Sequence, residues 1–277
     1  MLSFNSNARN AGGILALVGS LTIGAGCVPA ISTQQEVQLG DQYAAELNRE
    51  LPLVRDQAIV NYINSLGNQI AQRADPRGLR YHFYVVNAPE VNAFAVPGGH
   101  VYVNRGLIER ATNMSELAGV LAHEIGHVVH RHSVEQIQRA QTANTGLAVV
   151  YGVLLGRSPS GIEQIGTQVI GSAVFAGYSR DAEREADETA IRFLVASGIN
   201  PEGLVTMFEK LLAERQRNPG GVAEWFSTHP TTEERIETTR QEIARLPAGS
   251  LQNLNTNSQA YADFRSRVNG LPASASR

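Results

Sequence analysis

A single cysteine, Cys27, is all that the sequence offers for disulfide chemistry, so no disulfide can form within the chain. Basic residues are not in excess either, because 23 Lys and Arg stand against 26 Asp and Glu, giving a formal net charge of −3. Without a concentrated basic face, we expect no nucleic-acid partner. The fold must therefore rest on its apolar core, for which a hydrophobic content of 43% over 277 residues is sufficient.

The N-terminal region is typical of an export signal. Residues 11–26 are apolar and small, and Cys27 follows them directly. This apolar stretch is short for a membrane span, and we interpret residues 1–27 as a secretory signal peptide. The segment Gly24-Ala25-Gly26 before Cys27 resembles a bacterial lipoprotein processing site, which makes Cys27 a candidate for lipidation. The alternative is an ordinary cleaved signal, or an uncleaved anchor, with an incidental cysteine.

The chain beyond the signal predicts a mainly helical α+β domain over residues 28–247. Alternating apolar residues predict short strands over 80–86, 91–96 and 100–103, which indicate a small sheet with an exposed edge. The periodicity of apolar residues predicts helices over 33–50, 56–74, 113–132, 181–197, 202–216 and 233–245.

Two segments fit this pattern less well. Residues 143–178 hold two apolar stretches, each too short to cross a membrane, and favour a helical hairpin that packs on the core or covers the functional site. Residues 248–277 are polar and predict a C-terminal tail with one short helix near 260–268.

The segment His123-Glu124-Ile125-Gly126-His127 carries the clearest chemical signal. Its two histidines are separated by one helical turn, about 5.4 Å, so both imidazoles can bind one metal ion. Glu124 projects about 100° round the helix from His123 and can take a proton from an attacking water without binding the metal itself. The pattern predicts the zinc site of a peptidase. Gly126 in the helix interior indicates that another element packs closely there.

A catalytic zinc ion needs a third protein ligand. His130 lies about 10 Å along an unbroken helix from His123, too far to share one ion with it. We interpret His130 and His132 as helix-end residues, which are favourable at the negative end of the helix dipole.

Two acidic residues on a later predicted helix are better candidates. Glu183 and Asp187 are four residues apart on a face that continues through Ala190, Ile191 and Leu194, so both carboxylates point inward. Because a buried charge needs a partner, we predict that Glu183 is the third metal ligand and that Asp187 hydrogen-bonds a ligand histidine. The alternative is a buried ion pair with arginine.

Four segments, in this order, resemble the HtpX/BepA-like zinc metallopeptidases, the broad family that includes the CAAX prenyl endopeptidases and the mitochondrial Oma-type protease. The chain is most similar to the short envelope lipoproteins of that family. The membrane-embedded relatives carry transmembrane helices between the zinc helix and the third ligand, and residues 143–178 lack them. The segments are residues 92–99 with Val101-Tyr102-Val103, residues 123–127, Ser179-Arg180 with Glu183, Ala186 and Asp187, and Ser227-Thr228-His229-Pro230 with Arg235-Ile236.

The resemblance implies a zincin-type α+β fold with a small sheet beside the zinc helix and one Zn²⁺ per chain. It implies that Glu183 is a ligand and that Glu124 is the catalytic base. It also implies that the strand Ala93-Phe94-Ala95-Val96 lines the substrate cleft, where an extended peptide can add as a further strand.

The role of His229 stays open among three interpretations. Its imidazole can donate to the oxyanion of the tetrahedral intermediate. In BepA-like members the matching loop is thought to plug the site, with the histidine as a fourth zinc ligand, which would make the enzyme latent. A loop histidine without any metal contact is the third interpretation.

The sequence thus predicts a zinc metalloendopeptidase of the bacterial cell envelope, exported as a lipoprotein to the periplasmic side of the outer membrane. Its expected partners are unfolded or misassembled envelope proteins as substrates and the membrane through a lipidated N-terminus. The alternatives are an envelope chaperone or assembly factor with a latent, gated protease site, and a purely structural zinc protein.

Overall fold

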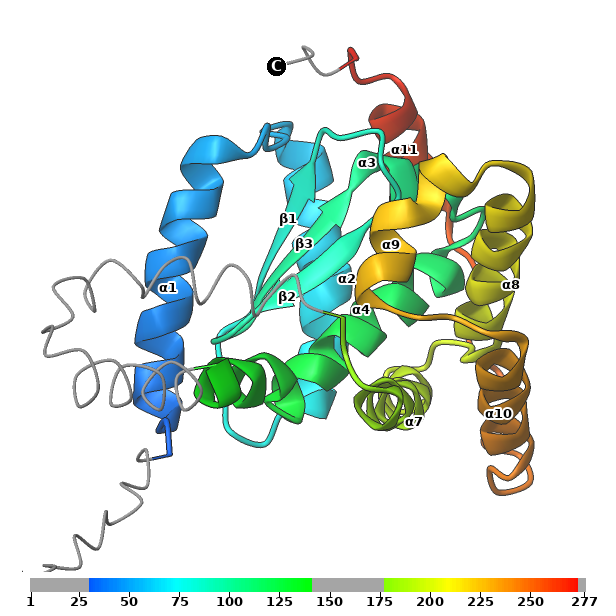
Figure 1. Ribbon diagram of the computed structural model, residues 1–277. Helices are drawn as coiled ribbons and strands as arrows, with labels where there is room; N and C mark the ends of the chain where they lie inside the picture. The colour runs from blue at the N-terminus through cyan, green and yellow to red at the C-terminus, as the bar shows by residue number, and fades with distance from the viewer. Residues whose placement is uncertain (1–29, 141–176, 274–277) are drawn as a thin grey trace, which may run out of the picture.

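The computed structural model describes residues 30–140 and 177–273. The predicted signal peptide with Cys27, and nearly all of residues 143–178, lie outside the described residues. The described chain forms a three-stranded sheet with helices on both sides (Figure 1), which confirms the prediction of a mainly helical α+β fold. The helices are α1 (Thr33–Glu50), α2 (Gln57–Ala74), α3 (Arg105–Arg110), α4 (Met114–Val129), α7 (Arg180–Ala196), α8 (Glu202–Arg217), the 3-10 helix η1 (Pro219–Val222), α9 (Ala223–Thr228), α10 (Glu233–Ala244) and α11 (Gln259–Asn269), and residues 132–140 are also helical.

The sheet has the strand order β1-β3-β2. β1 (His82–Val86) runs parallel to β3 (His100–Asn104), and β2 (Ala93–Val96) runs antiparallel to it. β2 therefore forms an edge of the sheet as the described residues build it.

The two faces of the sheet contact different helices because alternate residues point to opposite sides. The face of Phe83, Val101 and Ala95 belongs to the main core, shared with α2 and α4. The opposite face belongs to a smaller apolar cluster that includes residues of α1 and of helical residues 132–140. The sheet is thus a middle layer, with α1 on one side and α4 on the other (Figure 1).

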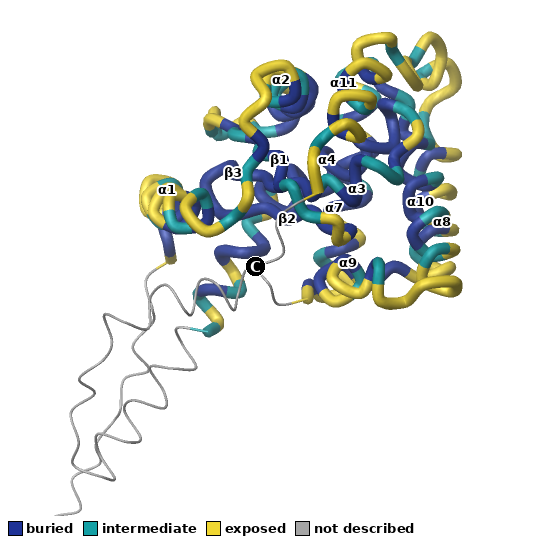
Figure 2. Tube along the Cα trace, turned by 90° about the horizontal axis from the view of Figure 1, so that it is seen from above, coloured by how far each residue is buried: buried dark blue, intermediate teal, exposed yellow. Residues whose placement is uncertain are grey.

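Helix α4 runs through the centre of the molecule and is buried on all sides (Figure 2). Every residue from Met114 to Val128 is buried. A Cβ placed on Gly126 would lie 3.0 Å from the Cα of Ala186 in α7. The prediction that Gly126 marks a close approach is confirmed, and this approach brings α7 next to the turn that carries His127.

A buried carboxylate ties α1 to the end of α4. Glu36, only 1% exposed, accepts hydrogen bonds from Arg77 at 3.3 Å and from Arg131 at 2.7 Å. Arg77 also donates to the carbonyl of Val128 at 2.8 Å and to the carboxylate of Asp75 at 2.8 Å. We call Glu36, Asp75, Arg77 and Arg131 the Glu36 cluster.

The C-terminal part of the described chain packs onto the domain. α11 places Tyr261, Phe264 and Val268 in the main core, and the hydroxyl of Tyr261 donates to the carbonyl of Ala111 at 2.7 Å. The short helix expected near 260–268 within the polar C-terminal tail is present, and it packs on the core. Three apolar side chains at helical spacing are enough to bury one face of an otherwise polar helix.

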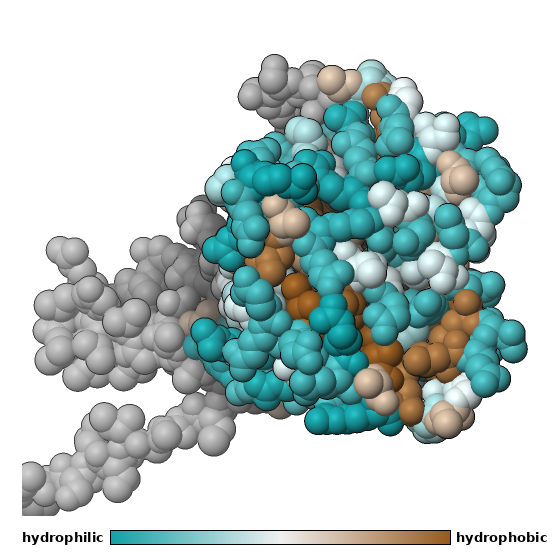
Figure 3. Space-filling view, turned by 90° about the vertical axis from the view of Figure 1, so that its right-hand side faces the viewer, coloured by the Kyte–Doolittle hydropathy of each residue, from teal (hydrophilic) through white to brown (hydrophobic). Residues whose placement is uncertain are grey.

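Little large apolar surface is exposed. Leu251, at 42%, is the only exposed large hydrophobic side chain among the described residues. The face that carries α8 and α10 is mostly hydrophilic, with apolar residues showing mainly in its lower half (Figure 3). Across residues 30–140 and 177–273, every helix is too short or too polar to span a lipid bilayer.

Candidate metal centre

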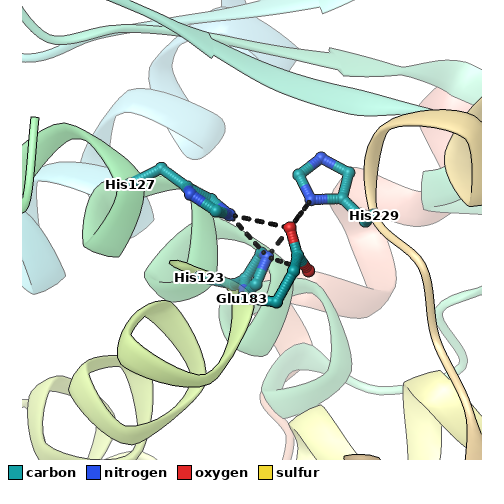
Figure 4. Close-up of side chains that lie close together, drawn as sticks. All are labelled: His123, His127, Glu183 and His229. Atoms are coloured by element: carbon teal, nitrogen blue, oxygen red, sulfur yellow. Dashed lines mark hydrogen bonds and ion pairs between the residues drawn. The ribbon is translucent and has the colours of Figure 1, made fainter. Parts of the chain in front are cut away.

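Four buried side chains converge beside the sheet (Figure 4). His123 and His127 come from α4, Glu183 comes from α7, and His229 follows α9. His123 Nε2 lies 3.0 Å from His127 Nε2 and 3.3 Å from His229 Nδ1, which in turn lies 3.1 Å from Glu183 Oε1. None of the four is more than 1% exposed. We call these four residues the metal cluster, since they form a group able to bind a metal ion.

The spacing of the ligand atoms fits a tetrahedral ion. A zinc ion bound at 2.0–2.1 Å by nitrogen or oxygen holds its ligand atoms about 3.3 Å apart in a tetrahedron. Five contacts within the cluster, which involve both oxygens of Glu183, run from 3.0 to 3.5 Å, and all four ligand atoms lie within 4.8 Å of one another. Three imidazoles and one carboxylate are buried here together. Without a cation the lone pairs of the imidazole nitrogens would face each other, which is unfavourable in a buried site. A bound metal ion would accept these lone pairs.

Glu124 lies beside the cluster without being part of it. Its side chain is fully buried, yet neither carboxylate oxygen accepts a hydrogen bond from any described residue. The imidazole of His229 lies close to it, with Nε2 3.4 Å from Glu124 Oε1. Burial raises the pKa of the Glu124 carboxyl above its ordinary value. A buried carboxylate without donors is expected where water or a ligand supplies the missing hydrogen bonds.

His123 is oriented by Asp187. The distance from His123 Nδ1 to Asp187 Oδ1 is 2.8 Å, so the other ring nitrogen of His123 faces the metal cluster. Burial alone would lower the pKa of His123, but hydrogen bonds to Asp187 and Glu183 raise it to about 9. The contact that the sequence predicted between Asp187 and a ligand histidine is present.

Arg235 in α10 pairs with both carboxylates of α7. It contacts Glu183 and donates to Asp187 Oδ1 at 2.8 Å, while its guanidinium carbon lies 4.4 Å from the centre of the Phe208 ring. Burial opposes ionisation, but attraction to Arg235 holds the pKa of Glu183 well below its usual range. The ion pair considered as an alternative to metal binding therefore exists, but Glu183 Oε1 still faces two histidines of the cluster.

Two residues that the sequence did not assign to the site hold His127. The ring of Tyr178 stacks on the imidazole with centroids 3.9 Å apart. His132 Nδ1 lies 2.8 Å from His127 Nδ1. His130 is the C-cap of α4, as expected of a helix-end residue, whereas His132 belongs to the next helical segment. The interpretation from sequence treated His132 as a helix-end residue and assigned it no contact with His127.

The loop after α9 places His229 in the metal cluster. Trp225 stacks on the imidazole with centroids 4.7 Å apart, and its indole nitrogen donates to Thr231 at 3.3 Å. The interpretation of His229 as a loop histidine away from the metal ligands is wrong, because its Nδ1 lies 3.1 Å from Glu183. In this conformation the imidazole takes the fourth corner of the cluster.

The edge strand β2 lies next to α4, and all four of its residues are buried. Asn104 donates to the carbonyl of Asn92 at 2.9 Å, which fixes the phase of the antiparallel ladder. The peptide groups of Phe94 therefore point toward β3, and those of Ala93 and Ala95, which are 0% and 2% exposed, point away from it. Within the described residues no further strand pairs with this edge.

The chain is similar to known metallopeptidases. Residues 57–243 match the profile described as peptidase family M48. The chain is 33% identical over 221 residues to the beta-barrel assembly-enhancing protease of Escherichia coli (strain K12), covering 78% of this chain and 45% of that protein. It is 31% identical over 212 residues to the metalloprotease YcaL of the same organism, covering 76% of each.

A more distant similarity reaches beyond bacteria. The mitochondrial metalloendopeptidase OMA1 of Saccharomyces cerevisiae is 31% identical over 165 residues, which cover 58% of this chain and 46% of that protein. The chain spans about half the length of the beta-barrel assembly-enhancing proteases that it matches.

Proposed function

Because the chain belongs to peptidase family M48 and is a metalloendopeptidase, we propose that it is a zinc-dependent enzyme of the bacterial cell envelope that degrades misfolded or misassembled envelope proteins. The observation that carries the proposal is the convergence of two histidines of α4 and a carboxylate of α7 beside the unpaired carboxylate of Glu124. A relative named for enhancing β-barrel assembly supports unassembled β-barrel proteins as a substrate class.

In this proposal His123, His127 and Glu183 hold the zinc ion. When bound, zinc supplies a Lewis acid that polarises the scissile carbonyl and makes a nearby water easier to deprotonate. Glu124 takes the proton of the attacking water and passes it to the leaving amine. The carboxylate of Glu124 suits this role because no described residue donates to it and because burial raises its pKa, which makes it the stronger base.

We assign substrate binding to the edge of β2 that faces away from β3. The peptide groups of Ala93 and Ala95 can pair there with an extended chain once this buried edge is uncovered, and backbone pairing gives little selectivity for sequence. Low selectivity agrees with unfolded proteins as substrates. An exported location, with lipidation at Cys27, remains part of the proposal and rests on the N-terminal sequence.

A second candidate function is an envelope chaperone or assembly factor whose protease site is latent. The position of His229 favours it, because four protein ligands are typical of a closed zinc site, whereas a catalytic site keeps one position open. Peptide hydrolysis then requires His229 to leave the cluster, after which its imidazole can donate to the developing oxyanion.

One assay separates these functions. The full chain with zinc is incubated with an unfolded outer-membrane β-barrel protein or casein, using wild type, Glu124→Gln and His229→Ala, each with and without 1,10-phenanthroline. We expect wild type to cleave, and we expect both the chelator and Glu124→Gln to abolish cleavage.

The other outcomes are equally informative. Cleavage that persists in Glu124→Gln contradicts the role of this residue as the base. Protection of the client by wild type, together with cleavage by His229→Ala, identifies the latent enzyme. Stoichiometric zinc with no turnover in any variant would show a structural metal and contradict both candidates.

A further inference from the structure

A row of three side chains leads from the surface to His127. Glu185 on α7 has a side chain that is 59% exposed, and its Oε2 lies 3.1 Å from His132 Nε2. The side chain of His132 is 5% exposed, and its Nδ1 lies 2.8 Å from His127 Nδ1. His127 Nε2 in turn faces the metal cluster, 3.0 Å from His123 Nε2. The row therefore ends at a residue that we assign as a metal ligand.

The protons of this row follow from its donors and acceptors. An ionised carboxylate only accepts, so His132 Nε2 carries the hydrogen that is donated to Glu185. Neutral His132 then has its lone pair on Nδ1 and accepts from the Nδ1–H of His127. With its proton on Nδ1, His127 presents the Nε2 lone pair to the cluster, and this is the form that a metal ion binds.

The opposite arrangement is incompatible with metal binding. If His132 donated from Nδ1, His127 would have to accept there and carry its own proton on Nε2. That proton would point at His123, and the lone pair needed by the metal would be lost.

We infer that His132 is a positioning residue of the metal centre, which accepts a hydrogen bond from His127 Nδ1–H and thereby keeps His127 Nε2 free for the metal. The inference rests on metal binding by the cluster, which is part of the proposed function. It also shows that the two ligand histidines are oriented differently. A carboxylate, Asp187, contacts His123 directly, whereas Glu185 reaches His127 only through the imidazole of His132.

The backbone is shaped to bring His132 onto His127. Arg131 has a φ of 60°, a left-handed conformation that side-chain-bearing residues rarely adopt, and it separates α4 from the helical segment that starts at residue 132. The guanidinium of Arg131 is held by Glu36 at 2.7 Å. A continuous helix would have carried His132 past His127, so this turn is what makes the contact possible.

A competing role for His132 is as a ligand of a second ion. His130, His132 and Glu185 offer ligand atoms within 4.8 Å of one another. If His132 bound an ion through Nε2, its own proton would lie on Nδ1 and point at the Nδ1–H of His127. If His132 bound the ion through Nδ1, it would lose the lone pair that accepts the hydrogen bond from His127. With neutral imidazoles, an ion at this group and an ion at the metal cluster therefore exclude each other.

The first test measures the zinc affinity of the full chain by competition with a chromogenic chelator. His132→Leu removes the acceptor but keeps apolar bulk, and we expect it to weaken zinc binding about 10–100-fold, as the loss of a group that orients a metal ligand does. His132→Asn offers a carbonyl oxygen in place of the imidazole nitrogen, and we expect it to restore most of the affinity. The matched control is His130→Leu, an exposed neighbour outside the row, which should bind as wild type does.

Two results would overturn the inference: wild-type affinity in His132→Leu, or an equal loss in His132→Asn, which would indicate packing alone. A wild type that binds no zinc would instead contradict the proposed function, and this inference with it.

The second test needs no variant and so does not depend on folding of the mutants. In zinc-loaded wild type labelled with ¹⁵N-histidine, NMR should show His127 protonated at Nδ1, and His132 protonated at Nε2 with a bare Nδ1. A proton on His132 Nδ1 would refute the assignment.

Discussion

Two groups of buried charge lie beside the C-terminal half of α4, and they differ in whether the protein itself supplies hydrogen-bond partners for their buried nitrogen and oxygen atoms. In the Glu36 cluster every buried side-chain nitrogen and oxygen has a hydrogen-bond partner among the described residues, and Glu36 itself meets two arginines. Beside the metal cluster, Glu124 is equally buried but receives no hydrogen bond from a described residue. The first group is satisfied by the described residues alone, and in the proposed function the second is completed by a metal ion and water.

This difference separates structural from functional buried charge. A satisfied group contributes to folding and depends on nothing in solution, whereas an unsatisfied group is stabilised by the ligand that it binds. The variants below act on one group or the other, in order of decreasing expected effect.

The largest effect is expected for Glu124→Gln, which keeps the shape of the side chain and removes the base. Peptide hydrolysis should fall by about 10²–10⁴-fold, the usual contribution of a positioned base. Stability should not fall, because a neutral amide is easier to bury than a carboxylate without donors. Both are checked by a peptide-cleavage assay, in the His229→Ala background if wild type is latent, and by urea unfolding. A strongly destabilised Glu124→Gln would contradict the comparison.

Zinc removal should have the next largest effect. With free zinc at 1,000 times its Kd, binding stabilises the folded state by about 4 kcal/mol, and a chelator removes that contribution. Urea unfolding with and without 1,10-phenanthroline measures it, and Glu183→Gln serves as the control that should respond little to the chelator. Identical unfolding curves for wild type in the two conditions would rule out metal binding to the folded state.

Glu36→Gln should destabilise the protein by about 3 kcal/mol, the lower end for a broken buried ion pair. The lower end applies because the side chains of Arg77 and Arg131 are 19% and 32% exposed and can recover some hydration. Most of the loss should be present without zinc, since this cluster needs no metal, and zinc can only add to it, because Glu36 also holds Arg131 at the turn that brings His132 onto His127. A loss that appears only in the presence of zinc would show that the two groups are not separate.

The smallest effect concerns pH and Asp75. Burial would raise the pKa of Asp75, but hydrogen bonds from Arg77 and Tyr81 outweigh it and hold the pKa below its ordinary value of 3.8. A depressed pKa stabilises the fold above the unfolded value, and this contribution disappears as the pH falls through the folded value. The stability gap between wild type and Asp75→Asn should therefore be full at pH 7 and shrink below a pH of about 4. Urea titrations at several pH values measure the gap, and a constant gap would contradict the assignment.

Local spacing was enough to find three of the four residues that converge, His123, His127 and Glu183, whereas His229 came from the family resemblance. The four-residue interval between His123 and His127 places both on one side of a helix, and the inward face of the later helix identified Glu183 and Asp187. The turn at residues 97–99 likewise indicated the strand that forms the sheet edge. In each case the information lies within one element, where the helical or strand period fixes which side chains share a face.

What the sequence did not reveal depends on how elements meet. Tyr178 reaches His127 from a segment far away along the chain, and Arg235 reaches Glu183 from α10. A period shows that a face is buried but not which element covers it. His132 was missed for a different reason: the sequence predicted that the helix ends at about residue 132, but it did not reveal that the left-handed Arg131 turns the chain so that His132 meets His127.

The two-residue break at His130 and Arg131 fixes the register between α4 and the next helix. Inserting or deleting one residue there would rotate His132 by about 100° and disconnect it from His127. The interval from His127 to His132 is then as constrained as the one inside H-E-x-x-H. A motif search for such centres should therefore ask for H-E-x-x-H-x-x-x-x-H, together with E-x-E where Glu183 and Glu185 stand. Such a search separates chains in which a further imidazole contacts the second ligand histidine from chains that orient both ligand histidines by other groups.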